Sequence, residues 1–312
     1  MPKRPKVLVG ISMHPRTMAR LREGAEVDVS LSWAQDLATS IGQYDGMIVY
    51  SPRFDPALLA GAQRLKVISC HSCPPEILAA ASSRGIRVTL VPSLWDTVAD
   101  MALALMFAAA RNMPQADSAI RRGEWGGQTD LKVRYSGLDV FGKTLGIIGL
   151  GRIGAILARR VRGLEMRLLY YDAVRKPELE QELGIAYRTL EQLLRESDIV
   201  SVQVPITEET RGMIGEREFR LMKRDAILVN TARGAILDQA ALCRALQERW
   251  IAGAGLDVFV EEPIAPDSPL LRLDNVVLAP HLGGSTQECD GVLVEDTLRV
   301  LAGQEPRHLA LR

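Results

Sequence analysis

The 312-residue chain contains few cysteines, few histidines and few aromatic residues: four, four and 5% of the sequence, respectively. Four scattered cysteines are too few for the disulfide framework of a secreted domain. The segment Cys70-His-Ser-Cys73 has the spacing of a zinc or redox motif. No second cysteine pair or histidine cluster accompanies it, so we predict no metal site there and interpret the segment as a strand end packed with small residues.

The chain also lacks a net charge and a long apolar run. Its 38 basic and 38 acidic residues balance, which argues against nucleic acid or an anionic membrane surface as a partner. The apolar run after the basic N-terminus stops at Ile11, too early for a signal peptide, and no run is long enough to span a membrane. We therefore expect a cytoplasmic protein in which a local basic group binds a small anionic ligand.

Length and composition indicate two globular domains. The chain is about twice the size of a typical domain, and 47% of its residues are hydrophobic and 24% charged. In residues 1–92, five short apolar runs alternate with helical stretches, which predicts βαβ units and a parallel sheet. The expected strands are Lys6–Ile11, Glu26–Val29, Gly46–Tyr50, Leu65–Ser69 and Ile86–Val91. A ligand would lie beyond their carboxyl ends, near Tyr50–Arg53 and Ser69–Pro75.

A glycine-rich turn organises the second half of the chain. The strand-like run Thr144–Ile148 leads into Gly149, Gly151 and Gly154, which have G-x-G-x-x-G spacing, and a helical pattern follows over Arg152–Arg162. In a dinucleotide site the first glycine allows a tight turn, the second lets backbone approach a pyrophosphate, and the third lets helix pack on strand. The helix N-terminus then faces phosphate charge.

An acidic residue follows the next strand-like run. Met166–Tyr171 ends at Asp172, about 20 residues after the last glycine. A carboxylate in this place would bind the ribose hydroxyls and repel a 2′-phosphate, so the sequence favours NAD over NADP. Arg175 and Lys176 follow closely, and we interpret them as part of a solvated loop.

The rest of the chain completes the expected architecture. Thr97–Arg111 is apolar almost all round and predicts a buried helix, whereas Ile120–Gly142 resembles a loop region. Ser285-Thr-Gln-Glu288 has the form of a capping box, which predicts a helix that starts near Ser285 and runs toward Leu301. The remaining expected strands are Ser197–Pro205, Ala226–Asn230, Ala252–Val258 and Asn275–Ala279.

Three polar residues follow these late strands: Arg233, Glu262 and His281. Since the carboxyl ends of parallel strands meet at one edge of a sheet, a ligand there would meet all three. A guanidinium can bind a carboxylate through two hydrogen bonds and polarise a carbonyl. A histidine can supply the proton that accompanies a hydride, and a carboxylate beside it orients the ring and favours its protonated form. Reduction of a 2-keto acid needs such a set.

Several long motifs occur in an order that resembles the D-isomer-specific 2-hydroxyacid dehydrogenase family over essentially the whole chain. The motifs are Gly149–Gly154, Val204–Thr207, Leu228–Gly234, Gly255–Phe259 with Glu262-Pro263, and Ala279–Thr286. The resemblance implies two flavodoxin-like and Rossmann-like α/β domains with parallel sheets that flank a cleft. Residues 1–97 and 285–312 would form the substrate domain, and residues 98–284 the NAD-binding domain. It also implies hydride transfer with NAD and a homodimer.

The same resemblance implies roles for individual residues. Arg233 would bind the substrate carboxylate and carbonyl, His281 would act as acid and base, and Glu262 would be its partner. Asp172 would bind the adenosine ribose, and Asp257 would contact the nicotinamide amide. The other implied cofactor-binding residues are Gly149, Gly151, Arg152, Ile153, Gly154, Val204, Pro205, Thr207, Thr231, Ala232 and Gly284.

The substrate domain departs from the family pattern after its fourth strand. Members usually carry a glycine-rich loop there whose backbone amides bind the substrate carboxylate, whereas Ser69–Glu76 is shorter and lacks those glycines. Pro74 and Pro75 have no N–H to donate. Ser72 and Cys73 therefore become the candidate substrate-binding donors.

The identity of the substrate and the physiological direction stay open at this stage. A small keto acid such as glyoxylate or hydroxypyruvate is favoured. One alternative is a phosphoglycerate dehydrogenase, although Tyr50 stands where such enzymes carry an arginine for the phosphate. The others are a phosphite-oxidising enzyme, which Val91–Trp95 loosely resembles, and a non-catalytic NAD-sensing protein similar to the corepressors of the family.

Overall fold

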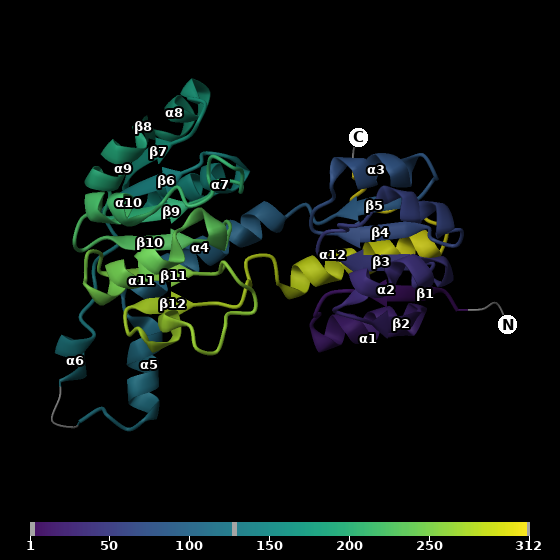
Figure 1. The fold of residues 1–312 in the computed structure, drawn as a ribbon, viewed down its shortest axis with the longest axis horizontal. Coiled ribbons are helices and arrows are strands. Elements are labelled where there is room, and N and C mark those ends of the chain that lie inside the picture. Colours follow the sequence, from purple (N-terminus) through teal and green to yellow (C-terminus); the bar gives the residue numbers. More distant parts are fainter. Residues whose placement is uncertain (1–3, 127–129, 311–312) are drawn as a thin grey trace. The chain divides into compact units, whose positions relative to one another are not determined.

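Figure 1 shows the fold of a computed structural model, which describes residues 4–126 and 130–310. The chain divides into two compact units. The first unit comprises the described residues up to Leu94 together with those from Gly284 onward, and the second unit comprises Trp95–Gly283. No helix in the described ranges combines the length and the apolar character needed to cross a membrane.

The first unit is built on a five-stranded parallel sheet with strand order β2-β1-β3-β4-β5. Its strands are β1 (Lys6–Val9), β2 (Glu26–Val29), β3 (Gly46–Val49), β4 (Val67–Cys70) and β5 (Arg87–Leu90). Every residue of β3 and β4 is buried, as expected for central strands covered on both faces. The predicted βαβ arrangement is confirmed.

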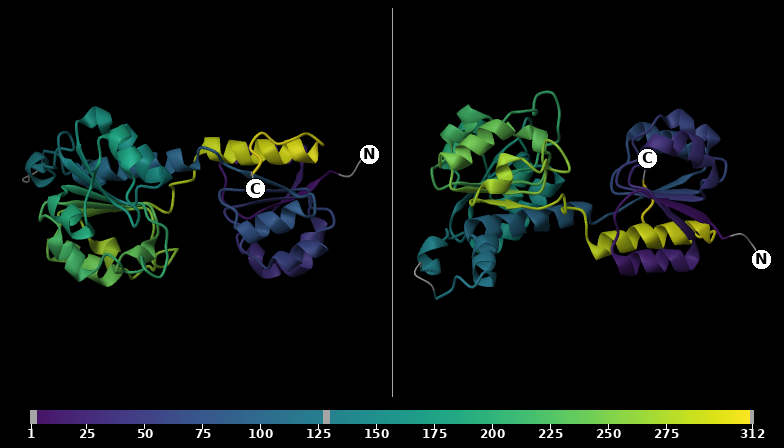
Figure 2. Two further views of the ribbon diagram at one scale, coloured as in Figure 1. Left: turned by 90° about the horizontal axis from the view of Figure 1, so that it is seen from above. Right: turned by 60° about the horizontal axis from the view of Figure 1, so that its bottom comes forward.

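Helices cover both faces of this sheet (Figure 2). The helices are α1 (Pro15–Gly24), α2 (Trp33–Ser40), α3 (Pro75–Ser82) and α12 (Gln287–Leu301), with short 3-10 turns η1 (Ile41–Gln43) and η2 (Pro56–Gly61). On one face, Leu21 of α1 and Leu293 of α12 pack against Val7 and Ile48. On the other face, α2 and α3 bury their apolar side chains.

The helix α12 starts near Ser285 and ends at Leu301, as predicted, but its capping residue differs. Thr286 is its N-cap residue, and its hydroxyl accepts a hydrogen bond from the backbone N–H of Cys289 at 3.2 Å. The predicted capping box with Ser285 as the cap is therefore wrong by one residue. Serine and threonine cap helices about equally well. The sequence alone therefore does not show which of the adjacent residues Ser285 and Thr286 is the cap.

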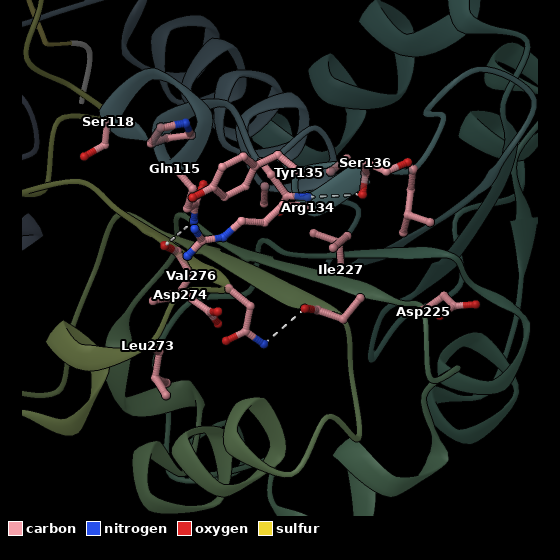
Figure 3. A pocket seen from close by; sticks show the side chains of 18 of the residues that line it. Gln115, Ser118, Arg134, Tyr135, Ser136, Asp225, Ile227, Leu273, Asp274 and Val276 are labelled. Carbon is pink, nitrogen blue, oxygen red and sulfur yellow. Dashed lines mark hydrogen bonds between the residues drawn. The ribbon is translucent and has the colours of Figure 1, made fainter. Parts of the chain in front are cut away.

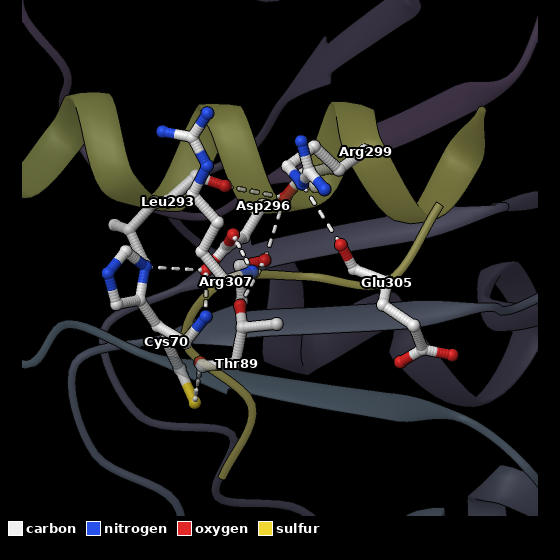
Figure 4. A network of polar contacts seen from close by, with 10 residues as sticks. Cys70, Thr89, Leu293, Asp296, Arg299, Glu305 and Arg307 are labelled. Carbon is white, nitrogen blue, oxygen red and sulfur yellow. Dashed lines mark hydrogen bonds and ion pairs between the residues drawn. The ribbon is translucent and has the colours of Figure 1, made fainter. Parts of the chain in front are cut away.

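A buried carboxylate on α12 fixes the segment that follows this helix (Figure 4). Asp296 is fully buried, and it accepts hydrogen bonds from the backbone N–H groups of Arg307 at 2.7 Å and His308 at 3.1 Å. The His308 ring lies 3.0 Å from the same carboxylate. The segment then pairs with β5, since the backbone N–H of Ala310 donates to the Val88 carbonyl at 2.8 Å. Backbone N–H groups of the segment after α12 thus provide hydrogen bonds to the buried Asp296 carboxylate.

The second unit contains a seven-stranded parallel sheet with strand order β12-β11-β10-β9-β6-β7-β8. The strands are β6 (Thr144–Ile148), β7 (Arg167–Tyr171), β8 (Ala186–Tyr187), β9 (Ile199–Val202), β10 (Ile227–Asn230), β11 (Gly253–Leu256) and β12 (Val276–Leu278). The strand order reverses beside β6, between β7 and β9. In open parallel sheets, nucleotides bind outside the carboxyl ends of the strands at such a point.

Two apolar layers enclose this second sheet. Its helices are α4 (Leu94–Ala110), α5 (Met113–Arg121), α6 (Leu131–Arg134), α7 (Arg152–Arg160), α8 (Pro177–Leu183), α9 (Leu190–Glu196), α10 (Glu216–Leu221) and α11 (Gln239–Gln247). The 3-10 turns are η3 (Val161–Leu164), η4 (Gly234–Ile236) and η5 (Pro269–Arg272). Leu105 of α4 and Leu157 of α7 pack on one face, and Leu193 of α9 and Phe219 of α10 on the other.

The loop predicted over Ile120–Gly142 is partly wrong. Ile120 lies in the last turn of α5, and the short helix α6 follows, with Asp130 as an N-cap whose carboxylate accepts from the Lys132 N–H at 2.9 Å. Residues 127–129 of the predicted loop lie outside the described residues. Both helices are short and have few buried residues, so apolar periodicity carried little signal for them.

Candidate active site

The three glycines of the turn after β6 have the packing expected of them. Gly149 has a φ of 98°, and a Cβ there would lie 2.7 Å from the Val204 side chain. At Gly154 a Cβ would lie 2.3 Å from the Gly149 carbonyl oxygen, so the start of α7 packs directly on the turn. At Gly151, by contrast, a Cβ would meet no described atom within 4 Å. The turn therefore leaves open space at the N-terminus of α7, which fits a pyrophosphate group.

Asp172 lies at the end of β7, next to this turn. Its carboxylate accepts a hydrogen bond from the Leu150 N–H at 2.9 Å and pairs with the Lys176 ammonium at 2.8 Å. Burial favours the neutral acid, but Lys176 and the backbone donors outweigh it and hold the pKa of Asp172 below its usual range. Asp172 is therefore a charged acceptor at the glycine turn, as a ribose-binding residue requires.

The predicted solvated loop holds for Arg175, which is exposed in a segment without helix or strand, whereas Lys176 is half-buried. Arg175 pairs with Glu180 at 2.8 Å. Lys176 donates to the Leu150 carbonyl at 2.8 Å in addition to its pair with Asp172. The acceptor for Arg175 comes from the following helix, α8, and tertiary folding brings Lys176 to the glycine turn.

The other cofactor-binding candidates follow neighbouring strands of the same sheet. Arg152 and Ile153 start α7, and the Arg152 guanidinium lies 4.3 Å from the centre of the Trp95 ring. Val204, Pro205 and Thr207 follow β9, and Thr231 and Ala232 follow β10. Gln203, which no sequence motif indicated, links these two strand ends because its amide donates to the Thr231 hydroxyl at 2.9 Å. Gly284 belongs to the first unit.

A buried asparagine positions Arg233 at the end of β10. The Asn230 side-chain oxygen accepts from the Ala232 N–H, and its amide donates to the Arg233 carbonyl, both at 3.0 Å. These two bonds fix the backbone turn, while the Arg233 side chain is exposed. Asn230 is not among the residues predicted from the sequence, although an asparagine that directly precedes a turn is a recognised signal for such bonds.

Close packing at Gly234 brings the Arg233 turn against the loop that follows β11. A Cβ at Gly234 would lie 1.9 Å from the Phe259 carbonyl carbon, so only glycine fits there. The Phe259 N–H in turn donates to one Glu262 carboxylate oxygen at 2.9 Å. The other Glu262 oxygen lies 2.7 Å from Nδ1 of His281. Backbone packing and two hydrogen bonds thus connect the loops that carry Arg233, Glu262 and His281.

Asp257 holds the backbone around His281. This residue is 1% exposed, and its two oxygens accept from the N–H groups of Leu282 and Gly283, each at 2.7 Å. Its carbonyl accepts from the His281 N–H at 2.9 Å. Burial raises the pKa of Asp257, and the two backbone donors act in the opposite direction. In this structure Asp257 is a positioning residue for His281, which has a left-handed backbone with φ of 55°.

An apolar cavity borders the histidine and glutamate pair. It has a volume of about 500 Å³ and is lined by Phe259, Glu262, Pro263, Ile264, Leu271, Leu278, Ala279, Pro280 and His281. Charge interactions are stronger beside apolar surfaces than in open water. The cavity therefore gives the His281 and Glu262 pair one apolar side, while both side chains stay partly exposed.

A second cavity, of about 660 Å³, lies elsewhere in the second unit (Figure 3). Side chains of α5, α6 and the segment before β12 line it, including Gln115, Arg134, Tyr135 and Asp274. None of the three catalytic candidates borders this cavity. It is therefore not part of the catalytic site.

The shortened loop after β4 corrects one substrate-binding prediction. The backbone N–H of Ser72 donates to the Tyr50 carbonyl at 3.2 Å, so it does not point to a ligand as a free donor. The Ser72 hydroxyl and the Cys73 N–H remain the candidates. Cys70 is buried at the end of β4, and no group of three or more His, Cys, Asp or Glu side chains suited to a metal ion occurs among the described residues.

Comparisons with known proteins agree with this geometry. The family model of the D-isomer specific 2-hydroxyacid dehydrogenase, NAD binding domain, matches residues 103–283. A glyoxylate reductase of Korarchaeum cryptofilum is 44% identical over 308 residues, which cover 94% of this chain and 90% of that protein. A protein structure from Thermus thermophilus is 37% identical with a TM-score of 0.79, covering 98% of this chain and 100% of that chain.

One of the solved structures similar to this chain is of an enzyme with a named activity. An NADPH-dependent glyoxylate/hydroxypyruvate reductase from Sinorhizobium meliloti is 29% identical, with a TM-score of 0.76 and coverage of 98% of this chain and 97% of that chain. The glycine turn, the paired histidine and glutamate, and these matches lead to one conclusion. The chain belongs to the D-isomer-specific 2-hydroxyacid dehydrogenase family and is an NAD(P)-dependent oxidoreductase that acts on CH–OH donors.

Proposed function

We propose that this protein reduces a small 2-keto acid, such as hydroxypyruvate or glyoxylate, to the D-2-hydroxy acid, with NADH as the reductant. The observation that carries the proposal is the 2.7 Å contact between His281 and Glu262, on loops packed against the Arg233 turn. This combines a proton donor, its orienting carboxylate and a carboxylate-binding cation. The glyoxylate reductase relative at 44% identity supports the same substrate class.

When bound, the nicotinamide cofactor supplies the hydride that reduces carbon 2. Arg233 would bind the substrate carboxylate and polarise the keto group. Because Nδ1 of His281 faces Glu262, Nε2 is the ring atom that would donate the proton to the keto oxygen. Glu262 stabilises the imidazolium before the transfer and fixes the ring orientation, and Asp257 holds the loop in place. In the oxidative direction His281 would accept the same proton.

A panel of substrates tests this proposal. We would follow NADH oxidation by the purified protein with glyoxylate, hydroxypyruvate, pyruvate, phosphohydroxypyruvate and bulkier 2-keto acids. A separate reaction would contain NAD and phosphite. Turnover on a small keto acid, with kcat/KM well above that for the other compounds, is expected. Preference for phosphohydroxypyruvate or phosphite would replace the proposal with one of those activities, and NADH binding without turnover would favour the sensor alternative.

We also propose that Asp172 makes the enzyme prefer NADH to NADPH. Its charge is maintained by Lys176 and by the Leu150 N–H, and a carboxylate there would repel a 2′-phosphate. Asp172→Ala is expected to raise KM for NADH roughly tenfold, since a hydrogen bond to a charged group is lost, and to lower the NADH/NADPH ratio of kcat/KM. Steady-state kinetics with both cofactors measure this.

Lys176→Ala is the matched control for this prediction. Removal of the cation leaves the Asp172 charge without its partner, so discrimination against NADPH should increase rather than decrease. The Sinorhizobium relative is NADPH-dependent, so the choice of cofactor needs this direct test. A wild-type enzyme that uses NADPH as well as NADH would contradict the proposed preference.

We further propose a homodimer formed through α5 and α6. Met113, Ile120 and Val133 on these helices are 58%, 48% and 75% exposed, which is unusual for large apolar side chains that lie close in sequence. The 660 Å³ cavity opens beside the same helices (Figure 3). Analytical ultracentrifugation should give twice the 34.3 kDa mass, and Ile120→Asp with Val133→Asp should shift the protein to monomer. A monomeric wild type would contradict this interface.

A further inference from the structure

Arg152, the first residue of α7, contacts an aromatic ring rather than a carboxylate. Its guanidinium lies 4.3 Å from the centre of the Trp95 ring, and within the described ranges it forms no ion pair or side-chain hydrogen bond. The other two arginines of this helix do pair with acids: Arg159 with Glu182 at 2.6 Å, and Arg160 with Asp96 at 3.0 Å. The ring is therefore the side-chain partner that distinguishes Arg152 from its neighbours.

A cation is unfavourable at this end of a helix. The free backbone N–H groups make a helix N-terminus positive, so acidic side chains are favoured in the first turn and basic ones in the last. The first turn of α7 contains no acidic residue, whereas Arg159 and Arg160 lie in its last turn. The exposed Arg152 thus adds a charge to an end that is already positive, beside the open space at Gly151. Two positive groups at one open turn favour an anionic ligand.

An aromatic face can hold a guanidinium without using its hydrogen bonds. The N–H donors of an arginine lie in the plane of the group, whereas an aromatic ring attracts the charge through its π face. A carboxylate partner would instead occupy two donors and offset the charge. The Trp95 contact therefore restricts the position of Arg152 and leaves its donors available for phosphate oxygens.

The start of α4 is itself fixed on α7. Trp95 is half-buried in the first turn of α4. Arg160 pairs with Asp96 at 3.0 Å and with Asp100, one turn further along α4, at 2.9 Å. Its guanidinium also donates to the Asp96 carbonyl. All these residues belong to the second unit. The contacts of Arg160 thus hold the first turn of α4 so that the Trp95 ring lies against Arg152.

We propose that Trp95 is a positioning residue that holds the Arg152 guanidinium for the pyrophosphate of the nicotinamide cofactor. The inference extends the proposed function, because it rests on a dinucleotide as the cofactor and not on which keto acid is reduced. Without the ring, the long Arg152 side chain would be free to adopt many rotamers, and ordering it on binding would cost affinity. Trp95 therefore raises the affinity for NADH and takes no part in hydride transfer.

A double-mutant cycle on NADH affinity tests this role. Trp95→Leu keeps an apolar side chain but removes the π face. We expect the Kd for NADH, measured by titration calorimetry, to rise about three- to tenfold, the range for loss of a partly exposed cation–π contact. In the Arg152→Met background the same substitution should leave Kd unchanged, because the cation that the ring positions is absent.

Trp95→Phe is the matched control. Phenylalanine keeps an aromatic face that attracts a cation less strongly than indole does, so its Kd should lie between those of the wild type and Trp95→Leu. In steady-state kinetics Trp95→Leu should raise KM for NADH, while kcat at saturating NADH stays within about twofold. Displacement of NADH by ADP-ribose, which contains the pyrophosphate, should weaken in Trp95→Leu, whereas displacement by adenosine should not.

The outcomes distinguish this role from a purely structural one. A loss of NADH affinity that disappears in the Arg152→Met background supports the inference. An equal loss in both backgrounds would mean that Trp95 acts on the fold or contacts the cofactor directly, and it would overturn the inference, as would an unchanged Kd in Trp95→Leu. If Trp95→Leu does not fold, Trp95→Met and Trp95→Phe take its place in the cycle.

Failure of the proposed function would be a separate result. A protein that binds NADH but reduces no keto acid would still give a Kd for each variant, so the cycle would decide the role of Trp95 on its own. Conversely, reduction of a keto acid with NADH by a Trp95→Leu variant of unchanged Kd would keep the proposed function and exclude the positioning role.

Discussion

Replacement of His281 by alanine should lower kcat for keto acid reduction by about a thousandfold or more, the upper range for loss of a general acid. The pair with Glu262 at 2.7 Å, on a loop fixed by Asp257, indicates that this ring is positioned for one proton transfer. NADH should still bind with an unchanged dissociation constant, because the glycine turn after β6 does not involve His281. Single-turnover kinetics and NADH fluorescence titration measure the two effects separately.

Glu262→Gln is the matched control for His281→Ala. The amide retains most of the geometry but removes the charge, so we expect a smaller loss, about 10- to 100-fold in kcat. A kcat for His281→Ala within tenfold of the wild type would exclude His281 as the proton donor.

Replacement of Arg233 by alanine should reduce kcat/KM for hydroxypyruvate or glyoxylate by about a thousandfold, equivalent to about 4 kcal/mol of transition-state stabilisation. The Arg233 side chain is exposed, while Asn230 and Gly234 fix its backbone. The substitution should therefore leave the folded structure unchanged. Steady-state kinetics on the purified variant, with thermal unfolding to verify its stability, provide the measurement.

Arg233→Lys separates charge from geometry. Lysine supplies a positive charge but not the two parallel N–H donors of a guanidinium. We expect it to recover only part of the activity, with KM still raised. Full activity in the lysine variant would mean that charge alone is needed, and an unchanged KM in Arg233→Ala would remove Arg233 from substrate binding.

Much of the fold could be predicted from local patterns. The buried strands are short apolar runs separated by helical stretches, and a parallel sheet covered on both faces requires that pattern. The glycine spacing predicted the turn between β6 and α7 because each of the three positions has a steric requirement that glycine meets. Boundaries were less certain: the capping prediction at Ser285 failed by one residue, and α6 was missed because it is a single short helix.

The sequence by itself therefore determined the α/β architecture, the nucleotide turn and the identity of Arg233, Glu262 and His281 as candidates. Only the tertiary structure decided how these residues are held. Gly234 packs against Phe259, and the Asp257 carboxylate accepts hydrogen bonds from the backbone after His281. The physical reason is that these contacts join residues far apart in the chain, often through backbone groups.

The same reason explains the features that no motif indicated. Ser72 loses its backbone donor to Tyr50, and Lys176 pairs with Asp172, only once the loops are folded. The burial of His71 likewise depends on β4, Tyr50 and Gly284 together. Backbone N–H and carbonyl groups are common to almost all residues, so a hydrogen bond to them leaves no signature in the sequence and becomes visible only in three dimensions.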